Sequence, residues 1–201
     1  MRSMRWALTG VVAILVSCGG GSSSSNGEVS STTSDASSTS TVAGTEVVYK
    51  VGDTGPGGGI IVYVSEEGFS SAGSLDTDLG AMCLLDICNY IEAALNDLPE
   101  SEWKDAMLAV QIYETSTAVD WILPTKDALN EFYKYSIMNS SSPNDTYWSL
   151  SYDFSRPDLV WAQMFTDPPT DGSTGETPVK GEQYQASKKG VTAFARPMRA
   201  F

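Results

Sequence analysis

Among the side chains that could act as acid, base or nucleophile, histidine is missing, because the sequence contains none. Histidine is the commonest general acid or base near neutral pH, so its absence excludes Ser-His-Asp and Cys-His mechanisms. A glycosidase would need two carboxylates across a cleft, and candidate pairs include Glu66 with Glu67 and Asp76 with Asp78. Both pairs fall in segments that we expect to be turns, where acids are usually solvated. We therefore predict that the protein is not an enzyme and needs no cofactor.

Cys83 and Cys88 could form a disulfide or contribute to a metal site. The sequence has three cysteines, and if Cys18 is lipidated, one pair remains outside the reducing cytosol. Zinc would need two further ligands, and there is no histidine to supply them. We predict a disulfide that closes a short loop, with no metal bound.

Two other patterns resemble ligand sites. The glycine-rich run at residues 55–59 could hold a phosphate, but a phosphate loop needs a following helix and a β-branched run follows here. Asp167, Asp171 and Glu176 could bind calcium, but their spacing does not fit an EF-hand loop. We predict a turn at residues 55–59 and a solvated loop at residues 167–177.

Aromatic side chains are the remaining candidates for binding. Sugar faces stack on exposed rings without needing charge, and four rings are available for this role: Tyr147, Trp148, Tyr152 and Trp161. The alternative is that the tryptophans, with Trp121, form the core, because large aromatic side chains are buried on average.

The net charge restricts the partners of the protein. The whole chain carries −13; removal of Arg2 and Arg5 with a signal peptide would leave 10 basic and 25 acidic side chains, a charge of −15. Long-range repulsion then disfavours nucleic acid, anionic lipid and sulfated polysaccharide. A neutral glycan or a protein is the more compatible ligand.

The N-terminus has the features of an export signal. Arg2 and Arg5 precede an apolar run at residues 6–16 that is too short to span a bilayer. The residues LVSC at positions 15–18 resemble the lipobox of bacterial lipoproteins, which makes Cys18 the predicted lipid anchor. A plain signal peptide with an incidental cysteine is the alternative. We predict a signal peptide at residues 1–17.

A low-complexity segment follows and separates the signal from the folded part. Of the 27 residues from 19 to 45, 15 are Ser or Thr and none is aromatic, so this segment cannot bury enough apolar surface to offset the entropy of ordering. We predict a lipidated, disordered tether at residues 18–45 and one domain at residues 46–201, a length that suits a single core.

Strands and helices are predicted from periodicity and caps. Runs rich in Val, Ile and Tyr predict strands at residues 46–50, 60–64, 159–165 and 190–201. By propensity, residues 90–95 could form a helix. Asp97, with Pro99 and Glu100, predicts the start of a helix whose core face holds Trp103, Ala106, Met107 and Val110. Thr125 caps a second helix, which buries Leu129, Phe132 and Tyr133.

A family resemblance is carried by motifs in a fixed order. They are YKVGDTGPGGGI at 49–60, YIEAA at 90–94, WILPTKDAL at 121–129, YWS at 147–149, WAQMF at 161–165 and RPMRAF at 196–201. Together they resemble the Lcl C-terminal domain family of the C-type-lectin-like superfamily. The resemblance implies an α+β fold with small mixed or antiparallel sheets, two short helices and paired N- and C-terminal strands. It also favours a strand over a helix at residues 90–95. The strand at 47–50 or at 60–64 would then pair with residues 191–196.

The resemblance also shapes the functional prediction. The family's namesake is an adhesin that grips sulfated glycans, but the negative charge here favours a neutral glycan or a protein. The superfamily includes a cysteine-dependent oxidase, for which Cys83 and Cys88 would be the residues to compare. We predict a cell-surface lipoprotein whose lectin-like domain binds an extracellular ligand. A structural or protein-docking envelope protein is the alternative, and an enzyme is the third. Arg196 and Arg199 should lie partly buried against carboxylates or carbonyls; the alternative is that both are solvated.

Overall fold

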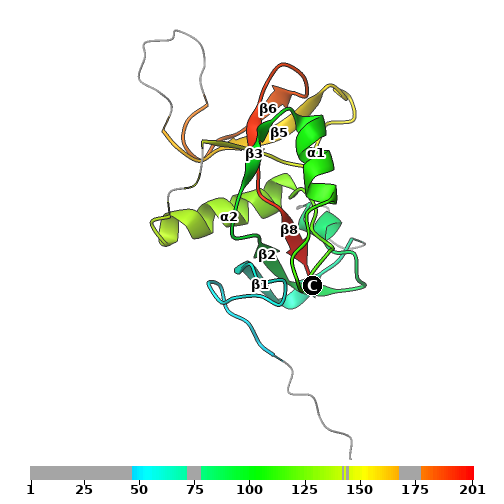
Figure 1. Ribbon diagram of the computed structural model, residues 1–201, viewed down its shortest axis with the longest axis vertical. Helices are drawn as coiled ribbons and strands as arrows, with labels where there is room; N and C mark the ends of the chain where they lie inside the picture. Colours follow the sequence, from blue (N-terminus) through cyan, green and yellow to red (C-terminus); the bar gives the residue numbers. More distant parts are fainter. Residues whose placement is uncertain (1–46, 72–77, 142, 144, 168–177) are drawn as a thin grey trace, which may run out of the picture. The chain divides into compact units, whose positions relative to one another are not determined.

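The computed structural model describes residues 47–71, 78–141, 143, 145–167 and 178–201, and its described part is a mixed α+β domain (Figure 1). This agrees with the predicted class. The elements in chain order are β1 (Ile60–Phe69), a short 3-10 helix η1 (Leu79–Met82), β2 (Cys88–Ala93), β3 (Leu98–Ser101), α1 (Trp103–Gln111), α2 (Lys126–Met138), β4 (Thr146–Trp148), β5 (Leu159–Met164), β6 (Gln183–Ser187), β7 (Ala193–Ala195) and β8 (Met198–Ala200).

The strands form two sheets. The three-stranded sheet is antiparallel with the order β1-β2-β8, and the five-stranded sheet has the order β3-β7-β4-β5-β6. The second sheet is mixed because β4 and β7 run parallel whereas the other neighbours run antiparallel. β-branched and aromatic side chains favour the pleated surface, and the predicted strands at 60–64, 90–95 and 159–165 are confirmed.

The predicted pairing of the first and last strands is wrong. β2 lies between β1 and β8, and residues 193–195 pair with β3 and β4 instead. Residues 47–50 are not in a strand. The two ends of the described domain still meet, because the Tyr49 and Phe201 ring centroids lie 5.7 Å apart and both rings pack on Tyr90.

α2 begins where the sequence predicts. The Thr125 hydroxyl accepts a hydrogen bond from the amide of Ala128 at 3.3 Å and satisfies one of the free amides of the first turn. Leu129 and Phe132 are buried under the helix, and Tyr133 is half-buried beside them. α2 contacts β1 of one sheet and β5 of the other, so it packs against both sheets.

The segment after Asp97 is a strand, not the predicted helix start. Two partners hold the Asp97 carboxylate: Arg196 Nε lies 2.6 Å from Oδ1, and the Tyr147 hydroxyl donates to Oδ2 at 2.7 Å. These contacts join the segment to β7 and β4, so β3 forms in place of a capped helical turn. α1 starts later, with Glu102 at its N-cap. Its predicted core face is confirmed, since Ala106 and Val110 are buried.

The buried side chains form two main clusters. One packs α2 against the three-stranded sheet and includes Ile91, Leu129 and Met198. The other packs α1 against the five-stranded sheet around Trp148 and Val160. No helix among the described residues is both long and apolar enough to cross a bilayer.

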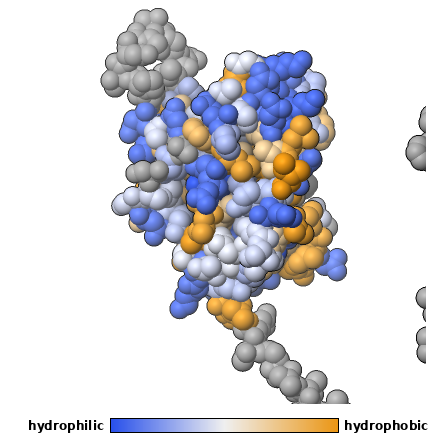
Figure 2. All heavy atoms as spheres, viewed as in Figure 1, coloured by the Kyte–Doolittle hydropathy of each residue, from blue (hydrophilic) through white to orange (hydrophobic). Residues whose placement is uncertain are grey.

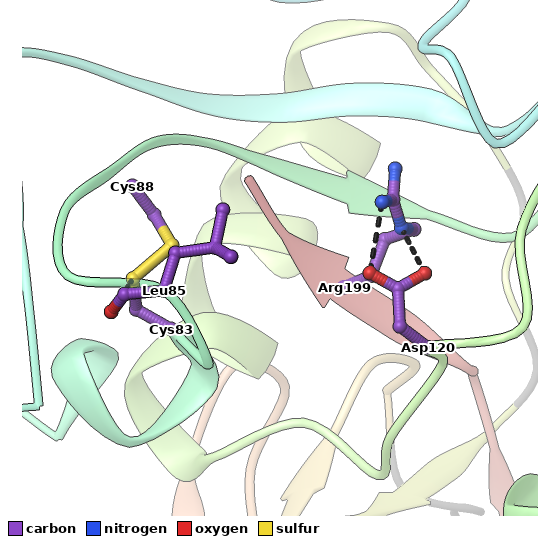
Figure 3. Close-up of a disulfide and its surroundings, with 5 residues drawn as sticks. All are labelled: Cys83, Leu85, Cys88, Asp120 and Arg199. Atoms are coloured by element: carbon purple, nitrogen blue, oxygen red, sulfur yellow. Dashed lines mark hydrogen bonds and ion pairs between the residues drawn. A yellow bond between two sulfur atoms is a disulfide. The ribbon is translucent and has the colours of Figure 1, made fainter.

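Cys83 and Cys88 form the predicted disulfide, drawn in Figure 3, with their Cα atoms 5.7 Å apart. Both cysteines are buried in the cluster beneath α2. The bond therefore fixes both ends of the loop at 84–87 to the core.

Candidate ligand-binding site

Two of the four predicted ligand-binding aromatics lie in the interior. Tyr147 and Trp148 are both 0% exposed, because β4 is the central strand between β5 and β7. The indole of Trp148 donates to the Ser101 carbonyl at 2.8 Å, and the Tyr147 hydroxyl donates to Asp97. Neither ring can stack against a ligand at the surface. This corrects the expectation for these two residues.

The other two predicted residues reach the surface. Tyr152 is 43% exposed in the loop between β4 and β5, and Trp161 on β5 is half-buried. The structure adds Phe154, which is 86% exposed and lies edge-on to Tyr152 with ring centroids 4.9 Å apart. Phe154 was not among the residues predicted from the sequence, although its place two residues after Tyr152 in a polar loop was a usable signal.

Trp103 belongs to the same surface. The ammonium of Lys188 lies 4.5 Å from the centroid of the Trp103 ring and 5.0 Å from that of Tyr152. It also donates to the Pro157 carbonyl at 2.6 Å. These contacts hold the loop after β4 against the start of α1. Figure 1 shows this yellow segment beside α1. We call Trp103, Tyr152 and Phe154 the aromatic platform.

A cavity of about 280 Å³ opens beside this platform. Its volume is near the lower end of the range for small-ligand sites. Tyr152 belongs to both features, so an aromatic ring borders the cavity. The lining residues are Asp78, Ala81, Thr125, Leu150, Ser151 and Tyr152.

Hydrogen bonds hold the polar groups of the cavity in place. The amide of Asp78 donates to the Asp127 carboxylate at 2.7 Å, and the amide of Asp127 donates to the Asp78 carboxylate at 3.1 Å. The Ser151 hydroxyl donates to Asp78 and accepts from the Lys126 amide. Each carboxylate oxygen of Asp78 accepts one such bond and retains a second lone pair for a ligand hydroxyl.

The Asp127 carboxylate of this cluster is held in its charged form. Burial is the largest single effect on Asp127 and raises its pKa, but the hydrogen bonds and charge of Lys126 and the bonds from Asp78 outweigh it. The pKa of Asp127 is therefore lowered from its usual value. A fixed carboxylate and a hydroxyl beside an exposed ring are the groups that orient a sugar.

A larger cavity, about 610 Å³, lies between residues 48–51 and the β1–β2 hairpin. The rings of Tyr49 and Tyr90 form part of its wall. The ammonium of Lys50 and the carboxylate of Glu66 have no partner within the described residues, and both side chains are exposed. The charged groups of this cavity are thus not fixed to orient a ligand, and we favour the smaller cavity.

The glycine-rich turn holds an anion that belongs to the protein itself. The predicted turn is confirmed, since Gly58 donates to the Gly55 carbonyl at 3.0 Å. The amides of Gly57 and Gly59 donate to the buried Glu92 carboxylate at 3.0 and 2.6 Å. The Glu92 carboxylate therefore takes the place that a bound anion would have in this loop. This role of Glu92 was not predicted from the sequence. Its alternating glycines, which leave no side chain over the amides, were the available signal.

The catalytic and metal-binding alternatives depend on acidic side chains, only some of which lie among the described residues. Glu66 and Glu67 lie on β1 and not in the predicted turn, and both are exposed. Asp76 lies outside the described residues, as do Asp171 and Glu176 of the acidic loop. No group of three or more Cys, Asp or Glu side chains in the described part of the chain could hold a metal ion.

Comparison with known proteins adds no identification. No protein-family model matches the chain, and no curated protein sequence is significantly similar to it.

Proposed function

We propose that the protein is an exported lipoprotein, anchored through Cys18, whose domain binds an extracellular neutral glycan without catalysis. The domain displays the aromatic platform and its cavity to that ligand. A C-type-lectin-like fold is part of the proposal. It is supported by the two helices, the small antiparallel and mixed sheets, and the contact between the two ends of the domain.

One observation carries the binding proposal. Tyr152 is 43% exposed and borders a cavity that also presents Asp78 and Ser151, while Phe154 extends the ring surface. The ring offers an apolar face and the fixed polar groups offer acceptors and donors for hydroxyls. A neutral ligand is favoured because the chain carries −13 and would repel anionic glycans.

A glycan array probed with the mature chain tests the proposal. Phe154→Ala should lower the affinity for any neutral glycan that binds by two- to tenfold, corresponding to about 0.5–1.5 kcal/mol for an exposed ring contact. Tyr152→Ala and Asp78→Asn should lower it at least as much. The matched control is Ile112→Ala on the surface after α1, because Ile112 and Phe154 are 83% and 86% exposed.

Two results would contradict glycan binding at this site. One is binding that the platform variants leave unchanged. The other is a blank array together with a co-purifying protein whose capture depends on Phe154, which would assign the same surface to protein docking.

The anchor is tested separately. Cys18→Ala should release the protein from the membrane fraction or block its processing. Membrane fractionation identical to that of the parent would exclude lipidation at Cys18 and leave the binding proposal intact.

A further inference from the structure

The loop closed by the disulfide displays three large aliphatic side chains to solvent. Leu84, Leu85 and Ile87 are 70%, 58% and 62% exposed, whereas Cys83 and Cys88 on either side are 3% and 0% exposed. Single exposed aliphatic residues need no explanation, but three within one six-residue ring form a patch of the kind that marks an interaction surface. We call Leu84, Leu85 and Ile87 the apolar prong.

The prong is fixed in place before it meets any partner. The disulfide joins its two ends in the core, and the Leu85 carbonyl oxygen lies 3.3 Å from Cys83 Sγ (Figure 3). Ile87 rests on Gly68 of β1, where an added Cβ would lie 2.5 Å from Ile87 Cγ2. A side chain held in this way loses little conformational freedom on binding.

The prong lies at the end of the domain where the described chain begins. The amide of Asn89, next to Cys88, donates to the Phe201 carbonyl at 2.8 Å, and the Phe201 ring packs on Tyr49. Val47 and Val48 add further aliphatic surface, at 62% and 72% exposed. Figure 2 shows orange patches on this lower part of the domain, while the yellow loop of the aromatic platform lies at the upper end in Figure 1.

The geometry points to insertion of the apolar prong into the surface of a lipid bilayer. A second copy of the chain is a poor occupant, because the prong is far smaller than the 20–30 residues that each side of a stable interface contributes, about 800 Å² per partner. A bilayer needs no complementary shape, so three exposed aliphatic side chains can insert there without a matching pocket. Docking at this end would leave the aromatic platform facing away from the membrane.

The charge of the protein selects the class of lipid. Asp86 lies within the loop itself, and the whole chain carries −13. Anionic headgroups would repel such a surface, whereas zwitterionic headgroups would not. The prong is therefore assigned to a neutral, zwitterionic surface, with binding that depends on apolar burial.

Vesicle sedimentation tests the assignment. The probe is phosphatidylcholine vesicles, and the protein is the chain from residue 18 with Cys18→Ser, so that no acyl anchor contributes. Leu84→Ser combined with Leu85→Ser should lower the partition coefficient by about tenfold or more, since apolar burial drives such binding. The matched control is Leu108→Ser with Ile112→Ser on and after α1, which are 51% and 83% exposed, and it should bind like the parent.

A second measurement detects insertion directly, so that a loss of binding caused by unfolding of the serine variant can be recognised. Leu85→Trp should show an indole emission that shifts to shorter wavelength with vesicles and is quenched by brominated phosphatidylcholine, whereas Ile112→Trp should show neither effect. Three results would overturn the assignment: the parent fails to bind, the Leu84/Leu85 variant binds as well as the parent, or binding requires vesicles that contain phosphatidylglycerol. Each outcome is independent of Cys18 and of any glycan.

Discussion

Arg199 and Asp120 form a bidentate salt bridge. Arg199 Nε lies 2.7 Å from one carboxylate oxygen of Asp120 and Nη2 lies 2.8 Å from the other (Figure 3). The remaining terminal nitrogen of Arg199 donates at 3.1 Å to Glu92, whose carboxylate is 0% exposed. One guanidinium thus joins β8 to β2 and to the segment before α2, as expected for a partly buried arginine.

Replacement of Arg199 should destabilise the domain strongly. Arg199→Met leaves the buried Glu92 carboxylate with amide donors but no counter-charge, and loss of one partner of a buried pair costs about 3–5 kcal/mol. The control is Arg156→Met, because Arg156 is exposed and lies 3.9 Å from Asp153. Chemical denaturation measures both variants. Equal stability of the two would show that Glu92 does not depend on Arg199.

Stability should fall in acid through Asp120. Burial, the largest single effect, raises the pKa of Asp120, but the bonds and charge of Arg199 outweigh it, so the pKa lies below its usual value of 3.8. A lowered pKa in the folded state stabilises the protein above the unfolded pKa, and this contribution is lost as the pH falls through the folded pKa. Asp120 is partly exposed, so we expect about 1 kcal/mol or less. Denaturation curves should show the parent to be more stable than Asp120→Asn at pH 7, and this difference should disappear as the pH falls below 3.8.

The glycine turn offers a test of close backbone approach. An added Cβ at Gly59 would lie 2.2 Å from the Ala93 carbonyl oxygen, whereas one at Gly58 would meet nothing within 4 Å. Gly59→Ala should therefore cost about 3 kcal/mol or more, because backbone atoms cannot move aside. Gly58→Ala should cost about 1–2 kcal/mol, from its positive φ alone. Thermal melts that place the two variants in the opposite order would contradict the turn geometry.

The disulfide should contribute modestly to stability. A ring of six residues restricts the unfolded chain only slightly, so reduction should lower the free energy of unfolding by about 2 kcal/mol. Alkylation should find no free thiol at Cys83 or Cys88 before reduction. Ready alkylation of both cysteines in the native protein would show that they are not paired.

Local signals predicted the helices better than the strand partners. The Thr125 cap and the apolar residues of α2 lie within two helical turns, so a short stretch of sequence is sufficient to define them. Asp97 also resembles a helix cap, but its carboxylate forms an ion pair with Arg196, 99 positions further along the chain. Likewise, the apolar pattern of residues 191–201 predicts strands without saying that β2 will lie beside β8.

The exposure of the aromatic side chains at the candidate site also could not be predicted from short stretches of sequence. Residue type selected the rings as candidates, but Tyr147 and Trp148 are buried by their position on a central strand, and Tyr152 reaches the surface by its position on a loop. The order of strands within a sheet depends on contacts far apart in the sequence. It was therefore not available from the local pattern that identified the rings.

The contact between Tyr49 and Phe201 makes the domain suitable for transplantation. The chain enters and leaves at one place, since the two ring centroids lie 5.7 Å apart. A few residues would span that distance, so the domain could be inserted into a surface loop of a host protein without separating the two sides of that loop. The same proximity allows circular permutation, with new ends at the exposed turn around Gly190.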